Sequence, residues 1–227
     1  MALLYQAELR PSKIEIIEAW APTQPWFEGS DGASFASVGS FRFDDPDGEV
    51  GIETMLVRVG DGPVLQIPLT YRGAPLVEGE AWLIGTMQHS VLGRRWVYDA
   101  TGDPAYLTAV ATAALTGGRQ AELYIDIDGV RVLREPTAVV VGSGKSETPL
   151  PALSATGPVS TRHEGGATVV EAGALRLIVE RLLTQRGPQS HDSSRPAAFD
   201  ATAPTAVLTG TWTNQPDPQT LVHAQAH

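Results

Sequence analysis

The stretch FASVGSFRFDDPDGEVGIETMLVRVGDGPVLQIPLTY, residues 35–71, decides the fold because it reads as three β-strands joined by tight turns. Three segments rich in β-branched and aromatic residues follow one another, at 35–43, 50–59 and 64–71. The separators are Asp-Asp-Pro-Asp-Gly at 44–48 and Gly-Asp-Gly-Pro at 60–63, which are turn-forming sequences. Short turns join consecutive strands antiparallel, so we expect an antiparallel meander.

Two helices are predicted, one before this meander in the sequence and one after it. Ser12 and Glu15 form a capping box at the start of the first helix, which ends before Pro22. Asp103 followed by Pro104 starts the second, because a capping carboxylate there precedes a proline at the first helical position. The second helix carries one apolar stripe, formed by Tyr106, Leu107, Val110, Ala111, Ala114 and Leu115.

Further strands are predicted from runs in which apolar and polar residues alternate. They lie at 3–9, 81–89, 94–98, 121–127, 130–133, 138–141, 168–171, 175–179 and 206–212. Residues 184–204 are polar and rich in proline and serine, which predicts a mobile loop. We therefore predict an α+β protein in two parts, residues 1–117 and a mainly antiparallel β-rich region at 118–227.

The composition excludes several kinds of site and partner. The 227 residues include no cysteine, so disulfides, thiolate zinc sites and iron–sulfur clusters are excluded. The formal net charge of −10 repels nucleic-acid backbones and anionic lipids, so we expect neither nucleic acid nor a membrane as a partner. The first residues lack the basic and apolar regions of a secretory signal, so we expect a cytoplasmic protein.

The segment Val141-Gly142-Ser143-Gly144-Lys145-Ser146 has part of the pattern of a phosphate-binding loop. However, the first glycine of G-x-x-x-x-G-K-[ST] falls on Val139. Pro149 and Pro151 stand where the phosphate-binding helix would begin. We therefore predict a solvated loop and no nucleotide site.

The acids and histidines show no spacing that is typical of a catalytic or metal site. The five histidines form no H-x-x-x-H pair, and Pro46 interrupts the acidic run at 44–49, which we interpret as a tight turn. Glu53, Asp99 and Asp103 are the candidate acids and bases of an enzyme, but the sequence alone does not bring them together. We therefore predict no catalytic residue, no metal and no cofactor.

The large aromatic residues have two interpretations. Aromatic faces stack on sugar rings, whereas tryptophans between a helix and a sheet more often anchor the core. The residues concerned are Trp20, Trp26, Phe27, Trp82, Trp96 and Trp212. We favour the core interpretation and keep an α-glucan platform as the alternative.

Four short motifs in the first half of the chain resemble one family. They are WAPTQPWFEG at 20–29, QIPLTY at 66–71, LIG at 83–85, and VYDA at 97–100 followed by Asp103-Pro104. In this order they resemble the N-terminal cap of maltokinases and of trehalose-synthase–maltokinase fusions, with Pro25 where that family usually has arginine. The resemblance implies a curved antiparallel sheet with a helix packed against it.

A similar comparison extends into the second half of the chain. Residues 160–162, 168–170 and 175–177 resemble strands of the N-lobe of these kinases, and Arg176 stands at the place of the ATP-binding lysine. Arginine presents a planar fork instead of a compact ammonium, so it is no functional copy of that lysine. Because the family continues into a C-lobe with its catalytic aspartate and magnesium ligands, we expect here a partial N-lobe and no phosphoryl transfer.

These expectations lead to three hypotheses about function. The first is a non-catalytic accessory protein of α-glucan, trehalose or maltose metabolism that docks on a protein partner or on a second copy of itself. The residues expected to dock are Trp20, Gln24, Trp26, Phe27, Arg94 and Arg95. The second is an α-glucan-binding module, and the third is a small enzyme of unknown reaction. Stand-alone relatives of the maltokinase cap are often called α-glucan branching proteins. A branching enzyme, however, needs a large barrel for which 227 residues are too few.

Overall fold

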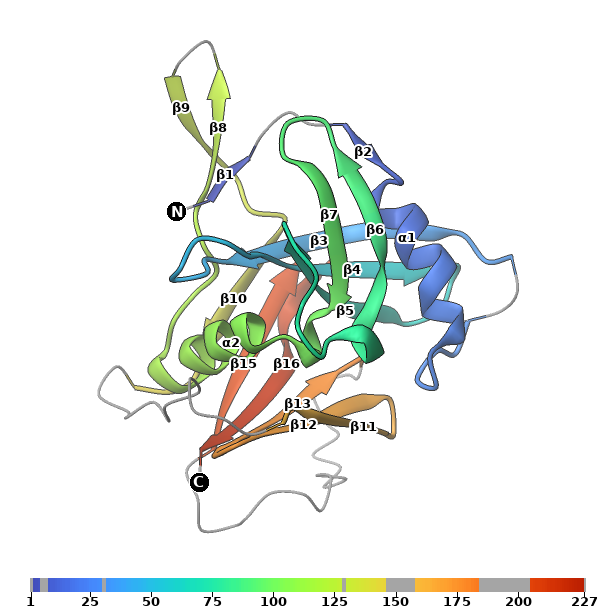
Figure 1. Cartoon of the computed structure of the whole chain (residues 1–227). Coiled ribbons are helices and arrows are strands. Elements are labelled where there is room, and N and C mark those ends of the chain that lie inside the picture. The colour runs from blue at the N-terminus through green and yellow to red at the C-terminus, as the bar shows by residue number, and fades with distance from the viewer. Residues whose placement is uncertain are drawn as a thin grey trace.

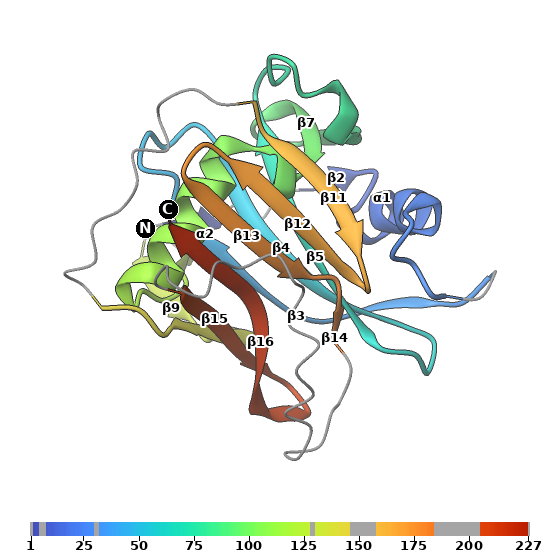
Figure 2. The same ribbon diagram turned by 90° about the horizontal axis from the view of Figure 1, so that it is seen from below.

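The computed structural model describes residues 2–4, 8–29, 32–127, 130–145, 158–183 and 205–226. Within these ranges the protein is mostly antiparallel β, with two α-helices and three sheets of seven, six and three strands (Figures 1 and 2). The short 3-10 helices are η1 (Ala21–Thr23), η2 (Glu80–Trp82) and η3 (Ala100–Gly102). Neither α-helix of the described part is long and apolar enough to cross a membrane.

The first sheet contains the predicted meander and is strongly curled (Figure 1). Its strands, in spatial order, are β2 (Leu9–Arg10), β6 (Leu83–His89), β7 (Gly93–Asp99), β5 (Val64–Arg72), β4 (Gly51–Val59) and β3 (Phe35–Phe43). Each neighbouring pair is antiparallel, so the meander at 35–71 and the hairpin around Gly93 are confirmed. β14 (Leu182–Leu183), from the second half of the chain, pairs with the start of β5.

Helix α1 (Lys13–Trp20) packs on one face of the first sheet and begins at the predicted capping box. The Ser12 amide donates to the Glu15 carboxylate at 2.7 Å, and the Glu15 amide donates to the Ser12 hydroxyl at 3.3 Å. These bonds satisfy amides that have no partner inside the helix. Ile16 and Ile17 are buried against apolar residues of β4 and β5, so the inward face of α1 matches its helical period.

Helix α2 (Pro104–Thr116) packs on strands of both large sheets, with its predicted stripe facing inward. Asp103 caps it by accepting from the Ala105 amide at 3.0 Å. Gly117 ends it with a φ of 74°, a left-handed conformation that glycine adopts without a Cβ clash. All six stripe residues are buried in one apolar cluster with β3, β4 and the second sheet.

The second sheet is antiparallel and lies below the first in Figure 1. Its strands, in spatial order, are β10 (Ala138–Gly142), β15 (Thr205–Trp212), β16 (Gln215–Ala226), β13 (Leu175–Glu180), β12 (Ala167–Ala172) and β11 (Ser160–Glu164). The hairpin predicted around Gly173 is confirmed. β16 is a central strand that the sequence pattern does not predict, because Pro216 and Pro218 interrupt its start, where its pairing with β15 is irregular.

The third sheet joins the N-terminus to the middle of the chain. β1 (Ala2–Leu4) runs parallel to β8 (Leu123–Ile127), and β9 (Val130–Arg134) pairs antiparallel with β8. The prediction of one strand over residues 3–9 is therefore wrong, since β1 and β2 belong to different sheets. Alternation of apolar and polar residues sets the face of a strand but not its partner.

The main apolar core draws on both sides of the predicted boundary at residue 117. Phe41, Ile52 and Leu56 from the first sheet share one cluster with α2 and with Val140 and Leu177 from the second sheet. β14 also carries the second half of the chain into the first sheet. The two predicted parts are thus continuous through their packing. The loop predicted at 184–204 lies outside the described residues.

Candidate functional site

Asp99, at the end of β7, is held by a buried arginine from the second half of the chain. The Arg181 guanidinium, fully buried, donates through Nη2 to both Asp99 carboxylate oxygens at 2.8 and 2.7 Å. Its Nε donates to the Thr168 hydroxyl at 2.8 Å, and its guanidinium carbon lies 5.1 Å from the centre of the Trp26 ring. This ion pair therefore gives Asp99 a structural role that joins the first sheet to the second.

Asp103, the cap residue of α2, also has a cation of its own. Arg72 donates through Nε and Nη2 to its two carboxylate oxygens, each at 2.7 Å, in a bidentate pair. The Thr70 hydroxyl donates to the same carboxylate at 2.7 Å. With the capping bond to the helix, these contacts use the acceptor positions of Asp103, so the residue is accounted for by the fold.

Glu53, on β4, pairs with Lys13 from the first turn of α1 at a distance of 2.5 Å between Oε2 and Nζ. Burial opposes its ionisation and is the largest single effect, but the charges of Lys13 and Arg42 outweigh it, so the pKa of Glu53 is lowered from its ordinary value. Burial and the Glu53 charge raise the pKa of the neighbouring Tyr71 well above 10. Glu53 is thus a carboxylate at neutral pH.

The register of the first sheet brings Glu53 and Asp99 into one row. Both lie opposite Leu69, on the two strands that flank β5, so their backbones are roughly 10 Å apart. An acid–base pair of the glycosidase type needs one carboxyl kept protonated. Here one acid is paired with Lys13 and the other with Arg181, which disfavours that interpretation.

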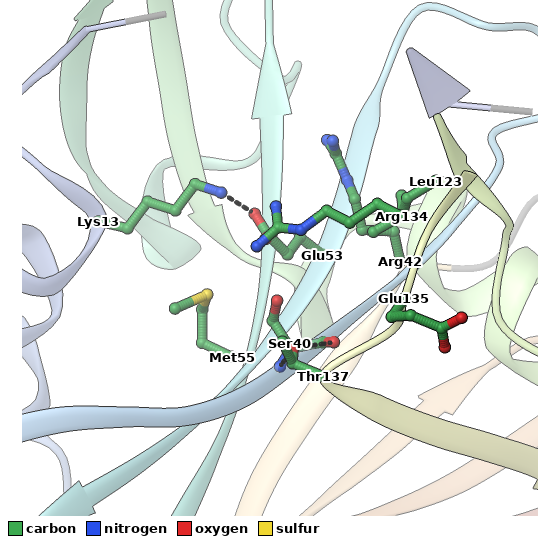
Figure 3. A pocket seen from close by; sticks show the side chains of 9 residues that line it. All are labelled: Lys13, Ser40, Arg42, Glu53, Met55, Leu123, Arg134, Glu135 and Thr137. Carbon is green, nitrogen blue, oxygen red and sulfur yellow. Dashed lines mark hydrogen bonds and ion pairs between the residues drawn. The ribbon is translucent and has the colours of Figure 1, made fainter. Parts of the chain in front are cut away.

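A polar cavity of about 180 Å³ opens beside Glu53, between α1, the first sheet and the third sheet (Figure 3). Its lining residues are Lys13, Ser40, Arg42, Glu53, Met55, Leu123, Arg134, Glu135 and Thr137. Two hydrogen bonds hold one wall in place: the Ser40 amide donates to the Thr137 hydroxyl at 2.9 Å, and that hydroxyl donates to the Ser40 carbonyl at 3.1 Å. The cavity therefore gathers three cationic and two acidic side chains from segments far apart in the sequence.

The aromatic residues predicted to dock surround the C-terminal end of α1. Trp26 is 3% exposed and packs edge-on against Trp20, with ring centres 5.6 Å apart, and Trp20 itself is partly exposed. Phe27 stacks on Phe35 at 6.0 Å, and the Gln24 amide donates to a neighbouring hydroxyl. Trp26 thus has the core role favoured for the tryptophans. Docking through this group stays a prediction.

The two arginines predicted to dock lie at the tip of the β6–β7 hairpin. The Arg94 guanidinium carbon lies 5.4 Å from the centre of the Trp96 ring, and Arg95 donates to the Leu92 carbonyl at 2.8 Å. Beside them, Val91 is 55% exposed and Leu92 is 45% exposed. We call residues 91–95 the hairpin tip. Sequence reasoning did not single out its two apolar residues, although two apolar residues beside a glycine turn are an available signal.

Arg176 has a partner on the neighbouring strand. Its Nε donates to the Glu171 carboxylate at 2.6 Å, and the two residues face each other directly in the β12–β13 pairing. Arg162, on β11, contacts the same carboxylate at 3.4 Å. Arg176 is therefore part of a cross-strand ion pair, and the similarity of this region to a kinase N-lobe stays a prediction.

The glycines of the phosphate-loop-like segment are used for packing. A Cβ on Gly142 or Gly144 would lie 1.9 Å from a carbonyl oxygen in the last turns of α2. The Gly144 amide donates to the Ala114 carbonyl at 2.9 Å. These glycines let the end of β10 approach the helix, which explains them without a nucleotide.

The acidic turn also has a local explanation. Asp45 accepts from the amides of Asp47, Glu49 and Val50 at 3.3, 3.1 and 2.9 Å, as in turns closed by an aspartate side chain. This agrees with the prediction of a tight turn. Among the residues that the structure describes, no group of three or more histidines and acids is placed to hold a metal ion.

Comparison with known proteins gives a family match within the first half of the chain. Residues 20–103 match the model of the maltokinase N-terminal cap domain. This segment runs from the last residue of α1 to the residue that caps α2. No curated protein matches the chain. The resemblance seen in the motifs is therefore confirmed: residues 20–103 match the maltokinase N-terminal cap domain.

Proposed function

We propose that this chain is a non-catalytic accessory protein of maltose, trehalose or α-glucan metabolism that docks on a protein partner. The observation that carries this proposal is the use of the acids in the matched segment. Glu53, Asp99 and Asp103 are each bound by a basic side chain, which leaves them as parts of the scaffold. The family match supplies the metabolic context.

The packing of the two halves supports a scaffold role. Arg181 crosses from the second half to Asp99, and β14 extends the first sheet, so the matched segment is built into a larger core. A surface carried on such a core is presented in a fixed orientation, which lowers the entropy cost of binding. We infer that the protein presents a surface and that its buried polar groups do no chemistry.

The hairpin tip is the part of the surface that we propose for docking. Val91 and Leu92 expose apolar side chains next to the cationic Arg94, on a protein whose net charge is −10. Protein interfaces are enriched in arginine and depleted in acidic residues, and covering exposed apolar side chains removes them from water. The partner that fits this tip has an apolar patch with acidic residues around it.

Two measurements test this function with purified proteins. The chain alone, incubated with ATP and maltose or glucosamine, is expected to form no sugar phosphate. The second measurement is binding to maltokinase and to trehalose synthase by biolayer interferometry. Binding to either enzyme supports the proposal, whereas turnover by the chain alone contradicts it.

Paired variants test the docking surface. Val91→Asp with Leu92→Asp places charge in the tip and should weaken binding at least 10-fold, because a polar group covered without a hydrogen-bond partner costs about 1–3 kcal/mol, and a charged group costs more. Val77→Asp is the control, since Val77 is 86% exposed on a different loop. Equal effects of the two changes would contradict docking through the tip.

An α-glucan-binding module is the second candidate, and the partial exposure of Trp20 and Trp96 favours it. Aromatic rings that are accessible on one face stack on sugars. Calorimetry with maltooligosaccharides and glycogen separates the two candidates. A flat titration at about 1 mM sugar, where binding energies near 4 kcal/mol are still measurable, argues against the module.

A further inference from the structure

We propose that the cavity of Figure 3 binds a small oxyanion, the phosphoryl group of phosphate or of a sugar phosphate, through Arg42 and Arg134. This inference goes beyond the docking function and does not depend on it. It makes the protein able to respond to a phosphorylated metabolite. Four features of the cavity carry it: the arrangement of its charges, its free donors, its fixed wall and its size.

The charges of the cavity do not cancel. Lys13 and Glu53 form a close ion pair, so they neutralise each other. Arg42 lies directly opposite Glu53 on the neighbouring strand and helps to keep that carboxylate ionised. Arg134 and Glu135 follow at the rim, with Arg134 drawn over the Lys13–Glu53 pair in Figure 3. Two arginines thus line the cavity against Glu135, an acid that has no ion pair with another residue in the described ranges.

Within the part of the chain that the structure describes, the donors of both guanidinium groups are available. Neither Arg42 nor Arg134 makes a side-chain hydrogen bond or ion pair with any residue in the described ranges, although the Arg42 charge acts on Glu53 at longer range. A guanidinium group presents several N–H donors in a plane, which matches the oxygens of a phosphoryl group. Among the described residues, the Ser40 hydroxyl also has no hydrogen-bond partner and adds one more donor at the wall.

The framework around these donors is fixed. Thr137 is joined to Ser40 by two hydrogen bonds, and Arg134 is paired with Leu123 in the β8–β9 ladder. The Ala121 amide donates to the Arg42 carbonyl at 2.7 Å, which ties the start of the third sheet to β3. The backbone positions that carry the two arginines are therefore fixed before a ligand arrives, which favours binding.

The size of the cavity selects the class of ligand. A volume of about 180 Å³ is well above the roughly 10–15 Å³ that a cavity needs to hold one water molecule. This space admits a phosphoryl group but is smaller than the roughly 300 Å³ or more of pockets that enclose whole metabolites. A sugar phosphate would therefore insert its phosphoryl group and leave the sugar outside.

A second hollow, which shares Thr137 with the first, shows that size alone does not identify the site. It has a volume of about 470 Å³ and is lined by Ser37, Val38, Gly39, Arg58, Thr137, Thr213 and Asn214. It is larger, but Arg58 is the one charged residue of its lining. Only the smaller cavity, of these two, combines several cations with a confined space.

Isothermal titration calorimetry at low ionic strength tests the site with inorganic phosphate, glucose 1-phosphate and glucose. We expect both phosphates to bind and glucose to give no heat. Tighter binding of glucose 1-phosphate identifies a sugar phosphate as the ligand, whereas equal or weaker binding identifies free phosphate. No heat with either phosphate at about 10 mM, where even affinities weaker than 1 mM give a signal, overturns the proposal.

Three charge variants make the test specific to this cavity. Arg134→Gln should weaken phosphate binding about 10-fold or more, because it removes charge-assisted hydrogen bonds. Arg131→Gln is the matched control and should leave affinity unchanged, since Arg131 lies three residues earlier on β9 and therefore faces the other side of the strand. Glu135→Gln removes a repelling charge and should tighten binding by roughly 2–5-fold.

The pattern of the three variants decides the outcome. Equal losses in Arg134→Gln and Arg131→Gln would show non-specific attraction of anions and would overturn the site. A weaker affinity in Glu135→Gln would do the same. Melting temperatures of the variants without ligand confirm that each is folded. The docking function is measured separately with Val91 and Leu92 on the hairpin tip, so either proposal can fail alone.

Discussion

Replacing Arg181 with methionine tests whether its ion pair with Asp99 joins the two halves of the protein. Methionine keeps much of the side-chain volume but removes the guanidinium, so Asp99, 5% exposed, loses two charge-assisted hydrogen bonds. Breaking a buried pair by removing one partner costs about 3–5 kcal/mol. At about 2–4 °C per kcal/mol for a chain of this length, the melting temperature should fall by roughly 6–20 °C.

Urea unfolding and thermal melting followed by tryptophan fluorescence measure this loss. Trp26 is a local reporter because its ring lies beside the Arg181 guanidinium. Arg119→Met is the matched control, since Arg119 is exposed, and we expect a change within about 0.5 kcal/mol. The double variant Asp99→Leu with Arg181→Met leaves no charge buried alone, so it should be more stable than the sum of the two single losses implies.

Two results would refute this reasoning. A loss below about 1 kcal/mol for Arg181→Met would mean that the buried carboxylate needs no cation. Additive losses in the double variant would mean that Arg181 and Asp99 act independently, although the distance between them is 2.7 Å. In either case the join between the two halves would rest on apolar packing and on the pairing of β14 with β5.

Three further predictions follow from the site. Burial opposes the ionisation of Glu53, but the charges of Lys13 and Arg42 outweigh it and lower its pKa. The ionised Glu53 therefore stabilises the fold above pH 4.5, and this contribution is lost as the pH falls through the lowered pKa. Glu53→Gln should reduce the pH dependence of the free energy of unfolding in the acidic range, measured by urea unfolding at successive pH values. Gly144→Ala should cost about 1–3 kcal/mol in thermal melting, because its Cβ would lie 1.9 Å from the Leu115 carbonyl oxygen, and an unchanged melting temperature would contradict this packing. Burial lowers the pKa of His89, so the folded state resists its protonation and stability should fall as the pH drops below 6.5; His89→Gln should remove that part of the slope.

The elements that the sequence predicted correctly are set by contacts between near neighbours. Ser12 and Glu15 are three residues apart, so their capping box forms wherever that segment becomes a helix. The stripe of α2 follows from the helical period, and the turns at 44–48 and 60–63 fix the meander. In each case the stabilising contact spans only a few residues.

Prediction failed where the contact joins distant segments. β1 and β2 alternate as one strand would, but they pair with β8 and β6 in different sheets. β16 begins with prolines, and its place between β13 and β15 depends on partners that pattern alone does not identify. The similarity to the maltokinase cap could be recognised from motifs, because the motifs are local runs of residues.

The polar sites show the same division most clearly. The sequence by itself determined the absence of cysteine, the acidic net charge, the capped helices and the cap motifs. Only the tertiary structure decided that Arg181 meets Asp99 across 82 positions, that Lys13 meets Glu53 across 40, and that Arg42 and Arg134 face one cavity. The physical reason is that an ion pair forms between side chains that folding brings together, and that proximity is set by sheet register and packing, which have no signature in the spacing of the residues themselves.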